Sequence, residues 1–147
     1  MELNQPISSV MTRDPICLGP VANLKQVEEA FRNNQFRHLP VVEGGILVGI
    51  LSKTDITCFK RGVEMTSPHR HAHISRSARV LDLMTSKPVT LAPDATIRDA
   101  MTIFSKSDFH AIPVVEGKRV IGIFTTRDLF RLISQKRISP GLEPHSV

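Results

Sequence analysis

The chain has 147 residues, of which 41% are apolar and 22% charged, and its mean hydropathy is close to zero at -0.04. These values are typical of a folded domain with its own core, and no apolar run approaches the roughly 18 residues of a membrane span, which excludes a transmembrane protein. Residues 60–79 carry most of the net charge of +5, with five basic side chains against one acidic, so the basic surface is local.

An internal repeat organises the chain. Residues 10–15 (VMTRDP) and 83–88 (LMTSKP) read alike at an offset of 73, and at that offset residues 11–56 match residues 84–129 at 16 positions without a gap. Each unit of about 46 residues is smaller than the roughly 70–80 residues that a lone core usually requires. We therefore expect the two copies to bury a face against each other in one pseudo-symmetric module.

Each unit is predicted to begin with a strand and an amphipathic helix. Residues 15–18 (PICL) and 88–91 (PVTL) are short apolar runs, each followed two residues later by a proline. After them, the spacing of Asn23 and Gln26, and of Thr96 and Asp99, is that of a capping box before apolar residues at helical spacing.

A hairpin and a second helix are predicted to complete each unit. Residues 39–42 and 112–115 lead through glycine-containing turns into 46–51 and 120–124, whose consecutive apolar residues imply strands buried on both faces. The last helix is expected over about 53–61, ended by Gly62 in the C-terminal capping position, and over about 126–136. The order β-α-β-β-α, present twice, predicts an α+β fold.

The start of the last helix carries the same motif in both units, Gly-h-h-Ser/Thr-x-x-Asp with h apolar, at 49–55 and 122–128. As a structural motif, Ser52 and Thr125 are N-caps and Asp55 and Asp128 stand at the third helical position, which contributes about 1 kcal/mol per cap. As a functional motif, the helix N-terminus is an anion site, and the carboxylate can accept hydrogen bonds from a ribose diol. The two interpretations are compatible.

In order, spacing and duplication, these segments resemble the CBS (cystathionine-β-synthase) domain. The carriers are Val10-Met-Thr12, the strands 39–42 and 112–115, and above all the two Gly-to-Asp segments. The resemblance covers 7–61 as CBS repeat 1 and 80–133 as CBS repeat 2, with a basic linker at 62–79 and a C-terminal tail at 134–147. It implies tandem repeats that pack through their sheets with pseudo-two-fold symmetry.

The resemblance further implies an adenine-nucleotide site in each repeat, for AMP, ADP or ATP, in which the aspartate takes the ribose hydroxyls and the Ser/Thr helps hold phosphate. Carried over by position, the first site comprises Cys17, His38, Leu39, Pro40, Ser52 and Asp55, and the second comprises Thr90, Ala111, Ile112, Pro113, Thr125 and Asp128. Since His38 is bulky where the second repeat has Ala111, we expect the second site to be the better one.

Four basic side chains near these positions have two interpretations. Arg37 and His110 are equivalent and stand beside the residues that would meet the base, while Lys53 and Arg127 lie inside the two motifs. They are either solvated side chains or cations that meet a phosphate. A cation at a helix start is unfavourable to the helix dipole, which slightly favours a bound anion.

The linker also has two interpretations. His69, His71 and His73 would share one face of an extended segment and could then bind Zn²⁺, Ni²⁺ or Cu²⁺, but without Cys or acidic partners a solvated loop is favoured and no metal site is predicted. Its arginines are expected either to reach the phosphates of a bound nucleotide or to attract anions only at long range.

No enzyme is expected, because the sequence holds no Walker loop, G-x-G-x-x-G or H-E-x-x-H motif and no catalytic triad can be nominated. The two cysteines and the lack of a secretory signal favour the cytoplasm. The expected function is a regulatory module that senses an adenine nucleotide or related adenosyl compound, forms a homodimer and signals to a separate effector protein. The alternatives are a nucleic-acid-binding module, which the scarcity of aromatic residues disfavours, and a purely structural dimerisation module.

Overall fold

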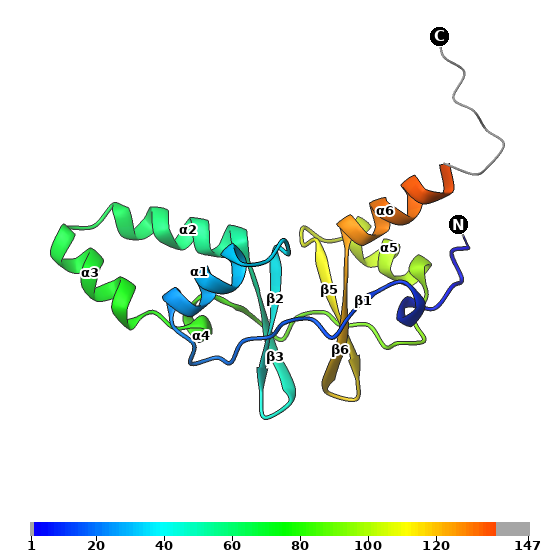
Figure 1. Ribbon diagram of the computed structural model, residues 1–147, viewed down its shortest axis with the longest axis horizontal. Helices are drawn as coiled ribbons and strands as arrows, with labels where there is room; N and C mark the ends of the chain where they lie inside the picture. Colours follow the sequence, from blue (N-terminus) through cyan, green and yellow to red (C-terminus); the bar gives the residue numbers. More distant parts are fainter. Residues whose placement is uncertain (1, 138–147) are drawn as a thin grey trace, which may run out of the picture.

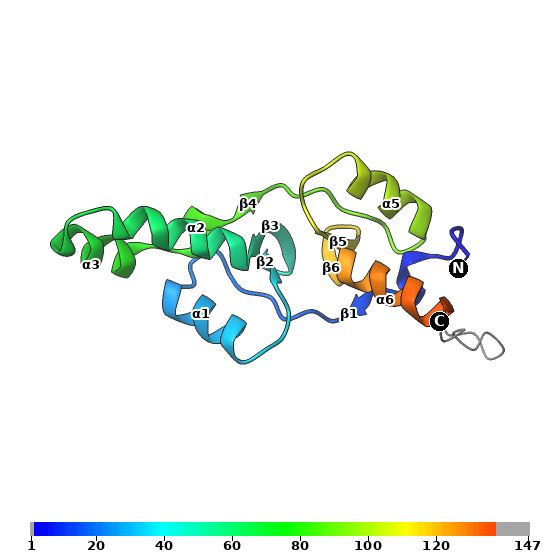
Figure 2. The same cartoon turned by 90° about the horizontal axis from the view of Figure 1, so that it is seen from above.

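The computed structural model describes residues 2–137 and places two lobes side by side, one for each repeat (Figure 1). A β-hairpin stands on the inner side of each lobe, and the helices lie outward of the hairpins, as the view from above also shows (Figure 2). The elements in chain order are the 3-10 helix η1 (Ile7–Ser9), β1 (Thr12–Arg13), α1 (Leu24–Arg32), β2 (His38–Glu43), β3 (Ile46–Ser52), α2 (Lys53–Glu64), α3 (Pro68–Ser77), α4 (Val80–Leu83), β4 (Thr85–Ser86), α5 (Ile97–Ser105), β5 (Ala111–Glu116), β6 (Arg119–Thr125) and α6 (Thr126–Arg137).

The two hairpins confirm the predicted repeat. In each, the strands are antiparallel and carry a register shift at the same place, between Val41 and Val42 and between Val114 and Val115. The turns use glycines in the left-handed region, Gly44 and Gly45 with φ of 57° and 81° in the first hairpin. Such a turn matches the twist of the flanking strands, which explains why glycine stands there.

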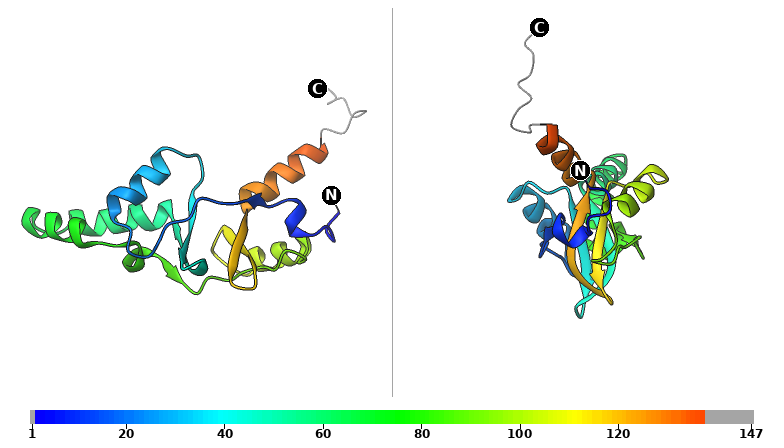
Figure 3. Two further views of the ribbon diagram at one scale, coloured as in Figure 1. Left: turned by 60° about the horizontal axis from the view of Figure 1, so that its bottom comes forward. Right: turned by 90° about the vertical axis from the view of Figure 1, so that its right-hand side faces the viewer.

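Each sheet is completed by a short strand from the start of the other repeat. β1 pairs with β6, and β4 pairs with β3, so that the three-stranded sheets have the orders β1-β6-β5 and β2-β3-β4. Figure 3 shows the blue N-terminal segment on the second lobe before the chain crosses to the first. The lobes therefore exchange their leading segments.

The repeated glycine of the Gly-to-Asp motif allows this crossing. A Cβ atom on Gly122 would lie 2.9 Å from the carbonyl oxygen of Thr12 and would collide with the sulfur of Met11. A Cβ atom on Gly49 would lie 2.9 Å from the carbonyl oxygen of Thr85 and would collide with the sulfur of Met84. A side chain at either position would push the crossing strand away.

The hydrophobic cores follow the same exchange. Ile7 and Met11 are buried in the cluster of the second lobe, with Ile97, Ile112 and Phe124. In the first lobe, Val80 joins a buried cluster whose other members are Leu24, Val27, Phe31, Leu39, Val41, Leu51 and Ile56. The two copies thus support each other chiefly by exchanging leading segments.

The capping boxes predicted for the first helix of each unit are confirmed. Asn23 and Gln26 exchange side-chain and backbone hydrogen bonds at the start of α1, and Thr96 and Asp99 do so at the start of α5. These bonds satisfy backbone N–H groups that the helix itself leaves unpaired.

The strands predicted at 15–18 and 88–91 are wrong in extent. Only Leu18 and Leu91 pair, each through a single parallel bridge, with Val41 and Val114. Leu18 donates to the Pro40 carbonyl and accepts from the Val42 N–H, but Pro40 and its equivalent Pro113 have no N–H to donate to residues 16 and 89, so the parallel pairing stops at one residue. The regular strands β1 and β4 lie just before the two predicted runs.

Two predictions about helix ends and the linker are also wrong. Gly62 does not end α2, which runs to Glu64, because Gly62 keeps helical backbone angles and nothing at that position requires a left-handed residue. The linker is neither extended nor a loop, since most of it forms α3, with Ser67 as N-cap and Pro68 in the first turn. In a helix His69 and His73 share one face and His71 does not.

Residues 134–137 of the expected C-terminal tail continue α6, and the rest of that tail, 138–147, lies outside the described residues. Within residues 2–137, no helix combines the length and apolar character that crossing a membrane requires.

Glycine-to-alanine changes test the crossing. Gly122→Ala is expected to lower the free energy of unfolding by about 1–3 kcal/mol, because the new methyl group must displace the backbone of β1. The matched control is Gly62→Ala, at a helical position with open space around it, which is expected to stabilise by about 0.5–1 kcal/mol. Urea unfolding measures both, and equal stability of Gly122→Ala and the parent would contradict the proposed close approach.

Candidate ligand-binding clefts

The two repeated helix starts have the capping geometry predicted from the sequence. The Ser52 hydroxyl accepts a hydrogen bond from the Asp55 N–H at 3.0 Å, and the Asp55 carboxylate accepts one from the Ser52 N–H at 2.8 Å. Thr125 and Asp128 repeat this arrangement at 3.1 and 3.0 Å. The structural interpretation of the motif is therefore confirmed, and each carboxylate is held in one orientation.

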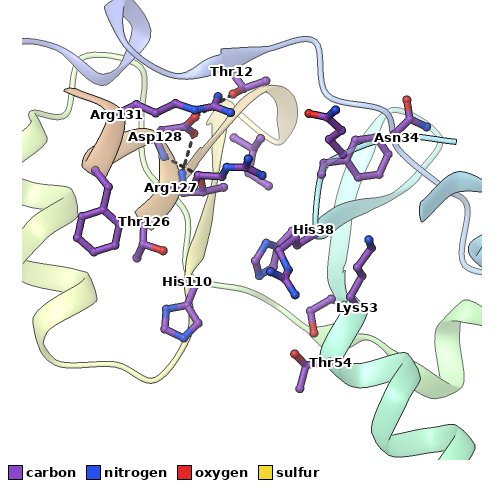
Figure 4. Close-up of a pocket in the computed structure, with 17 residues that line it drawn as sticks. Thr12, Asn34, His38, Lys53, Thr54, His110, Thr126, Arg127, Asp128 and Arg131 are labelled. Atoms are coloured by element: carbon purple, nitrogen blue, oxygen red, sulfur yellow. Dashed lines mark hydrogen bonds between the residues drawn. The ribbon is translucent and has the colours of Figure 1, made fainter. Parts of the chain in front are cut away.

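One cleft between the lobes opens onto Asp128, and we call it the Asp128 cleft (Figure 4). Its volume is about 840 Å³. It is lined by Thr12, Asn34, Gln35, Phe36, Arg37, His38, Ser52, Lys53, Thr54, His110, Ile123, Thr125, Thr126, Arg127, Asp128, Phe130 and Arg131. The Thr12 hydroxyl donates to Oδ1 of Asp128 at 3.3 Å, so the crossing strand β1 places a polar group directly on the motif.

A second cleft opens onto Asp55, and we call it the Asp55 cleft. Its volume is about 690 Å³, and it is lined by His38, Ile50, Ser52, Thr54, Asp55, Thr85, Lys87, Pro88, Val89, Ser107, Asp108, Phe109, His110 and Ala111. Thr85, Phe109 and Asp55 stand 73 residues from Thr12, Phe36 and Asp128, so the two clefts are related by the repeat.

Each cleft joins the motif of one repeat to the strand start of the other. Arg37 and His38 of the first repeat share a cleft with Asp128, and Ala111 of the second repeat shares a cleft with Asp55. The sites predicted from the sequence instead combined residues of the same repeat. The small Ala111 therefore lies beside Asp55, which removes the steric argument for preferring the Asp128 site.

Ten of the sixteen predicted site residues line one or both clefts. The six that line neither are Cys17, Leu39, Pro40, Thr90, Ile112 and Pro113. Leu39, Pro40, Ile112 and Pro113 are fully buried in the sheets, so they form the cores beneath the clefts.

The structure adds residues that sequence reasoning missed. Arg131 follows Arg127 by one helical turn on α6, a spacing that places both on one face and that a helical-wheel reading would have found. Thr12 and Thr85 belong to the repeated Met-Thr pair, but which cleft each of them lines follows only from the pairing of the crossing strands.

The linker arginines are not part of either cleft. Arg70, Arg76 and Arg79 line neither of them, and α3 lies at the end of the first lobe, away from the hairpins (Figure 2). Arg76 and Arg79 donate to nearby carbonyl groups of the linker. The prediction that these side chains reach a bound phosphate is wrong for this conformation.

His38 lies where the two clefts adjoin. Burial lowers the pKa of His38, and the neighbouring His110 and Arg37 lower it further, against the opposing effect of Asp55. The imidazole is therefore held in its neutral form near neutral pH, where it can both donate and accept a hydrogen bond.

Comparison with known proteins establishes the family. The CBS domain family model matches residues 7–60 and 80–135, so the chain belongs to the CBS domain family and contains two copies of the domain. The uncharacterized protein MJ1225 of Methanocaldococcus jannaschii is 32% identical over 132 residues, which cover 87% of this chain and 47% of that protein. This chain thus spans about half the length of that relative.

Solved structures share the fold. The crystal structure of MJ1225 matches with a TM-score of 0.76 at 28% identity, over 90% of this chain and 49% of that one. The structure of CBSX2 from Arabidopsis thaliana in complex with AMP matches with a TM-score of 0.75 at 22% identity, over 90% and 98%. The CBS domain pair of MJ0100 in complex with 5′-methylthioadenosine and S-adenosyl-L-methionine matches with a TM-score of 0.73 at 24% identity, over 90% and 98%. The predicted fold of tandem CBS repeats is confirmed.

The lowered pKa of His38 makes stability depend on pH. In the unfolded chain a histidine titrates near 6.5, so the unfolded state takes up the proton more readily than the folded state. The stabilising contribution is therefore present above that pH and is lost as the pH falls through the folded pKa. We expect His38→Gln to reduce the loss of unfolding free energy between about pH 7.5 and pH 5.

Urea unfolding at several pH values measures this change. The control is His73→Gln on α3, outside both clefts, which is expected to keep the parent's slope. An unchanged slope in His38→Gln would contradict the assignment.

Proposed function

We propose that this CBS pair is a regulatory module that binds adenine nucleotides or related adenosyl compounds in its two clefts and itself catalyses no reaction. The observation that carries the proposal is the duplicated helix start, with its hydroxyl and fixed carboxylate, facing a cleft between the lobes. The complexes of CBSX2 with AMP and of MJ0100 with two adenosyl compounds support it, since both proteins share this fold.

Capping leaves each carboxylate able to bind a ribose. An ionised carboxylate offers about four acceptor positions on its two oxygens. Asp128 uses one for the Thr125 N–H and one for the Thr12 hydroxyl, and Asp55 uses one for the Ser52 N–H. The remaining positions are enough for the two hydroxyls of a ribose diol, and capping prevents the carboxylate from rotating away.

The other parts of a nucleotide have complementary groups in the same clefts. The N-termini of α2 and α6 line the clefts, and their helix dipoles attract phosphate oxygens. The first N–H groups, of Lys53 and Thr126, donate to the carbonyls of Arg37 and His110, and the third donate to the caps, which leaves the N–H groups of Thr54 and Arg127 for a phosphate. In the Asp128 cleft, the side chains of Arg37, Lys53 and Arg127 add full positive charges. Phe36 and Ile123 line the same cleft and offer apolar surface for a base.

We further propose a cytoplasmic homodimer that passes its signal to a separate effector protein. The apolar side chains beside the crossing strands, Val10, Met11, Leu83 and Met84, pack against the cores of the chain itself. Two other apolar side chains remain exposed to solvent, Val21 at 76% and Leu81 at 57%. They are close together, since the Leu81 N–H donates to the Pro20 carbonyl at 2.9 Å, and a second copy of the chain is the occupant we propose.

Sedimentation tests the assembly. The parent is expected to sediment as a dimer of the 16.4 kDa chain, and the double change Val21→Asp with Leu81→Asp is expected to shift it toward monomer, because two carboxylates resist burial. Thr102→Asp, exposed on α5, is the control and is expected to leave the dimer intact. A parent that stays monomeric at all concentrations would overturn the dimer without affecting the nucleotide proposal.

Ligand-induced stabilisation tests the nucleotide proposal. A ligand at about 100 times its dissociation constant is expected to add roughly 2.7 kcal/mol to the free energy of unfolding, which raises the melting temperature by several degrees. Asp128→Ala and Asp55→Ala are each expected to weaken the ligand bound in their own cleft by about 1.5–3 kcal/mol, through loss of charge-assisted hydrogen bonds.

The matched control is Asp99→Ala. Asp99 caps α5 in the same way as Asp55 and Asp128 cap their helices, but it lines neither cleft, so its loss is expected to lower stability without changing ligand affinity. Thermal melting and calorimetry with AMP, ADP, ATP, adenosine and 5′-methylthioadenosine measure these effects. No shift with any of them at millimolar concentration would favour a purely structural module, and a steep salt dependence with polynucleotides in their place would favour nucleic-acid binding.

A further inference from the structure

We propose that the two clefts select adenosyl ligands of different charge. The Asp128 cleft takes a nucleotide that carries phosphate groups, and the Asp55 cleft takes an adenosyl compound without phosphate, either uncharged or cationic. This inference rests on the proposed function and adds to it that the two clefts bind different ligands.

The charged side chains differ sharply between the clefts. Four permanent cations line the Asp128 cleft around one carboxylate, namely Arg37, Lys53, Arg127 and Arg131. The Asp55 cleft is lined by two carboxylates, Asp55 and Asp108, and one cation, Lys87. The two imidazoles, His38 and His110, line both clefts and do not distinguish them.

Three of the differences arise at equivalent positions of the repeat and have the same sign. Arg127 corresponds to Thr54, and Arg131 corresponds to Cys58. Asp108 replaces the neutral Gln35. At each of these three pairs, the residue of the Asp128 cleft is the more positive one, and together they outweigh the opposite difference at Lys87, whose equivalent Asp14 does not line the Asp128 cleft.

The cations of the Asp128 cleft are available to a ligand. Within residues 2–137 the salt bridge between Lys60 and Glu28 is the one ion pair that forms, so none of the four cations is neutralised by a described carboxylate. Figure 4 shows Arg127 and Lys53 on opposite walls of the cleft, each at the start of a helix that begins there. Guanidinium groups on one wall and an ammonium on the other can hold phosphates from both sides.

The Asp55 cleft offers a phosphate group fewer partners, since Lys87 is the one permanent cation among its lining residues. A phosphate near the start of α2 would meet Thr54 where the other cleft has an arginine, and Asp108 would add a like charge on the same lining. Val89 and Phe109 are 47% and 36% exposed there and offer apolar contact to a thioether or methyl group. The carboxylate of Asp108 instead favours a cationic group on the ligand.

Calorimetry with single-cleft variants tests this division. The probes are ATP, 5′-methylthioadenosine and S-adenosyl-L-methionine, titrated into the full chain, its Asp128→Asn variant and its Asp55→Asn variant. ATP affinity is expected to fall at least roughly tenfold in Asp128→Asn and to stay within about twofold in Asp55→Asn, and the two unphosphorylated probes are expected to show the reverse. Asp99→Asn is the capping control and is expected to change neither.

Exchanging charges between the copies tests the cause directly. Arg127→Thr installs the residue of the equivalent position and is expected to weaken ATP roughly tenfold while leaving 5′-methylthioadenosine unchanged. The double change Thr54→Arg with Asp108→Gln is expected to make the Asp55 cleft accept ATP, seen as a second ATP site in calorimetry. Circular dichroism melts check that each variant is folded, and all of the exchanged side chains are exposed.

The outcomes separate this inference from the proposed function. If ATP and the unphosphorylated probes bind but lose affinity equally in Asp55→Asn and Asp128→Asn, the charge selection is overturned and nucleotide binding stands. If no adenosyl compound binds the parent, the proposed function itself fails. If Arg127→Thr binds ATP as tightly as the parent, cations of the Asp128 cleft do not select phosphate and the inference is overturned.

Discussion

The close backbone approach at Gly49 and Gly122 is the constraint on which the rest of the structure depends. Each glycine allows a two-residue strand from the other half of the chain to join the sheet, with Met84 or Met11 seated against it. Without that approach neither lobe would have its third strand or the buried side chains that precede it. The exchange also delivers the Thr12 hydroxyl to Asp128, so the same contact that completes a sheet completes the lining of a cleft.

The motif next to these glycines serves the fold and the site with the same atoms. The carboxylate of Asp128 must accept the Thr125 N–H to start α6, and this bond fixes the direction in which its free lone pairs face. A carboxylate oriented in this way loses little conformational entropy when a ligand binds. Capping of α6 and binding of a ligand would therefore not compete for Asp128, because they use different lone pairs of one carboxylate.

Much of the fold follows from local signals, whereas the partners of the site residues do not. The hairpins and the capping boxes are determined by residues close together in the chain, such as Gly44 and Gly45 or Asn23 and Gln26, and the repeat can be found by comparing the chain with itself. The pairing of Asp128 with His38, and of Asp55 with Ala111, depends on two strands crossing between the lobes. An offset of 73 shows which residues are equivalent and contains no information about which are neighbours.

The helix in the linker could have been predicted from the sequence, because the residues that start it are present. Ser67 followed by Pro68 is a good N-cap and first-turn pair, but the alternating histidines drew the interpretation toward an extended segment.

Duplication also explains how two clefts of one fold can differ in charge. The copies share the residues that the crossing and the caps require, which are the glycine, the hydroxyl and the aspartate of the motif. They differ at positions such as Thr54 and Arg127, whose side chains are exposed at the cleft mouths and take no part in either core. Substitution at an exposed position costs little stability, whereas a charge beside a bound phosphate changes affinity strongly. The fold therefore keeps the same capped helix start in both clefts and leaves their charge free to diverge.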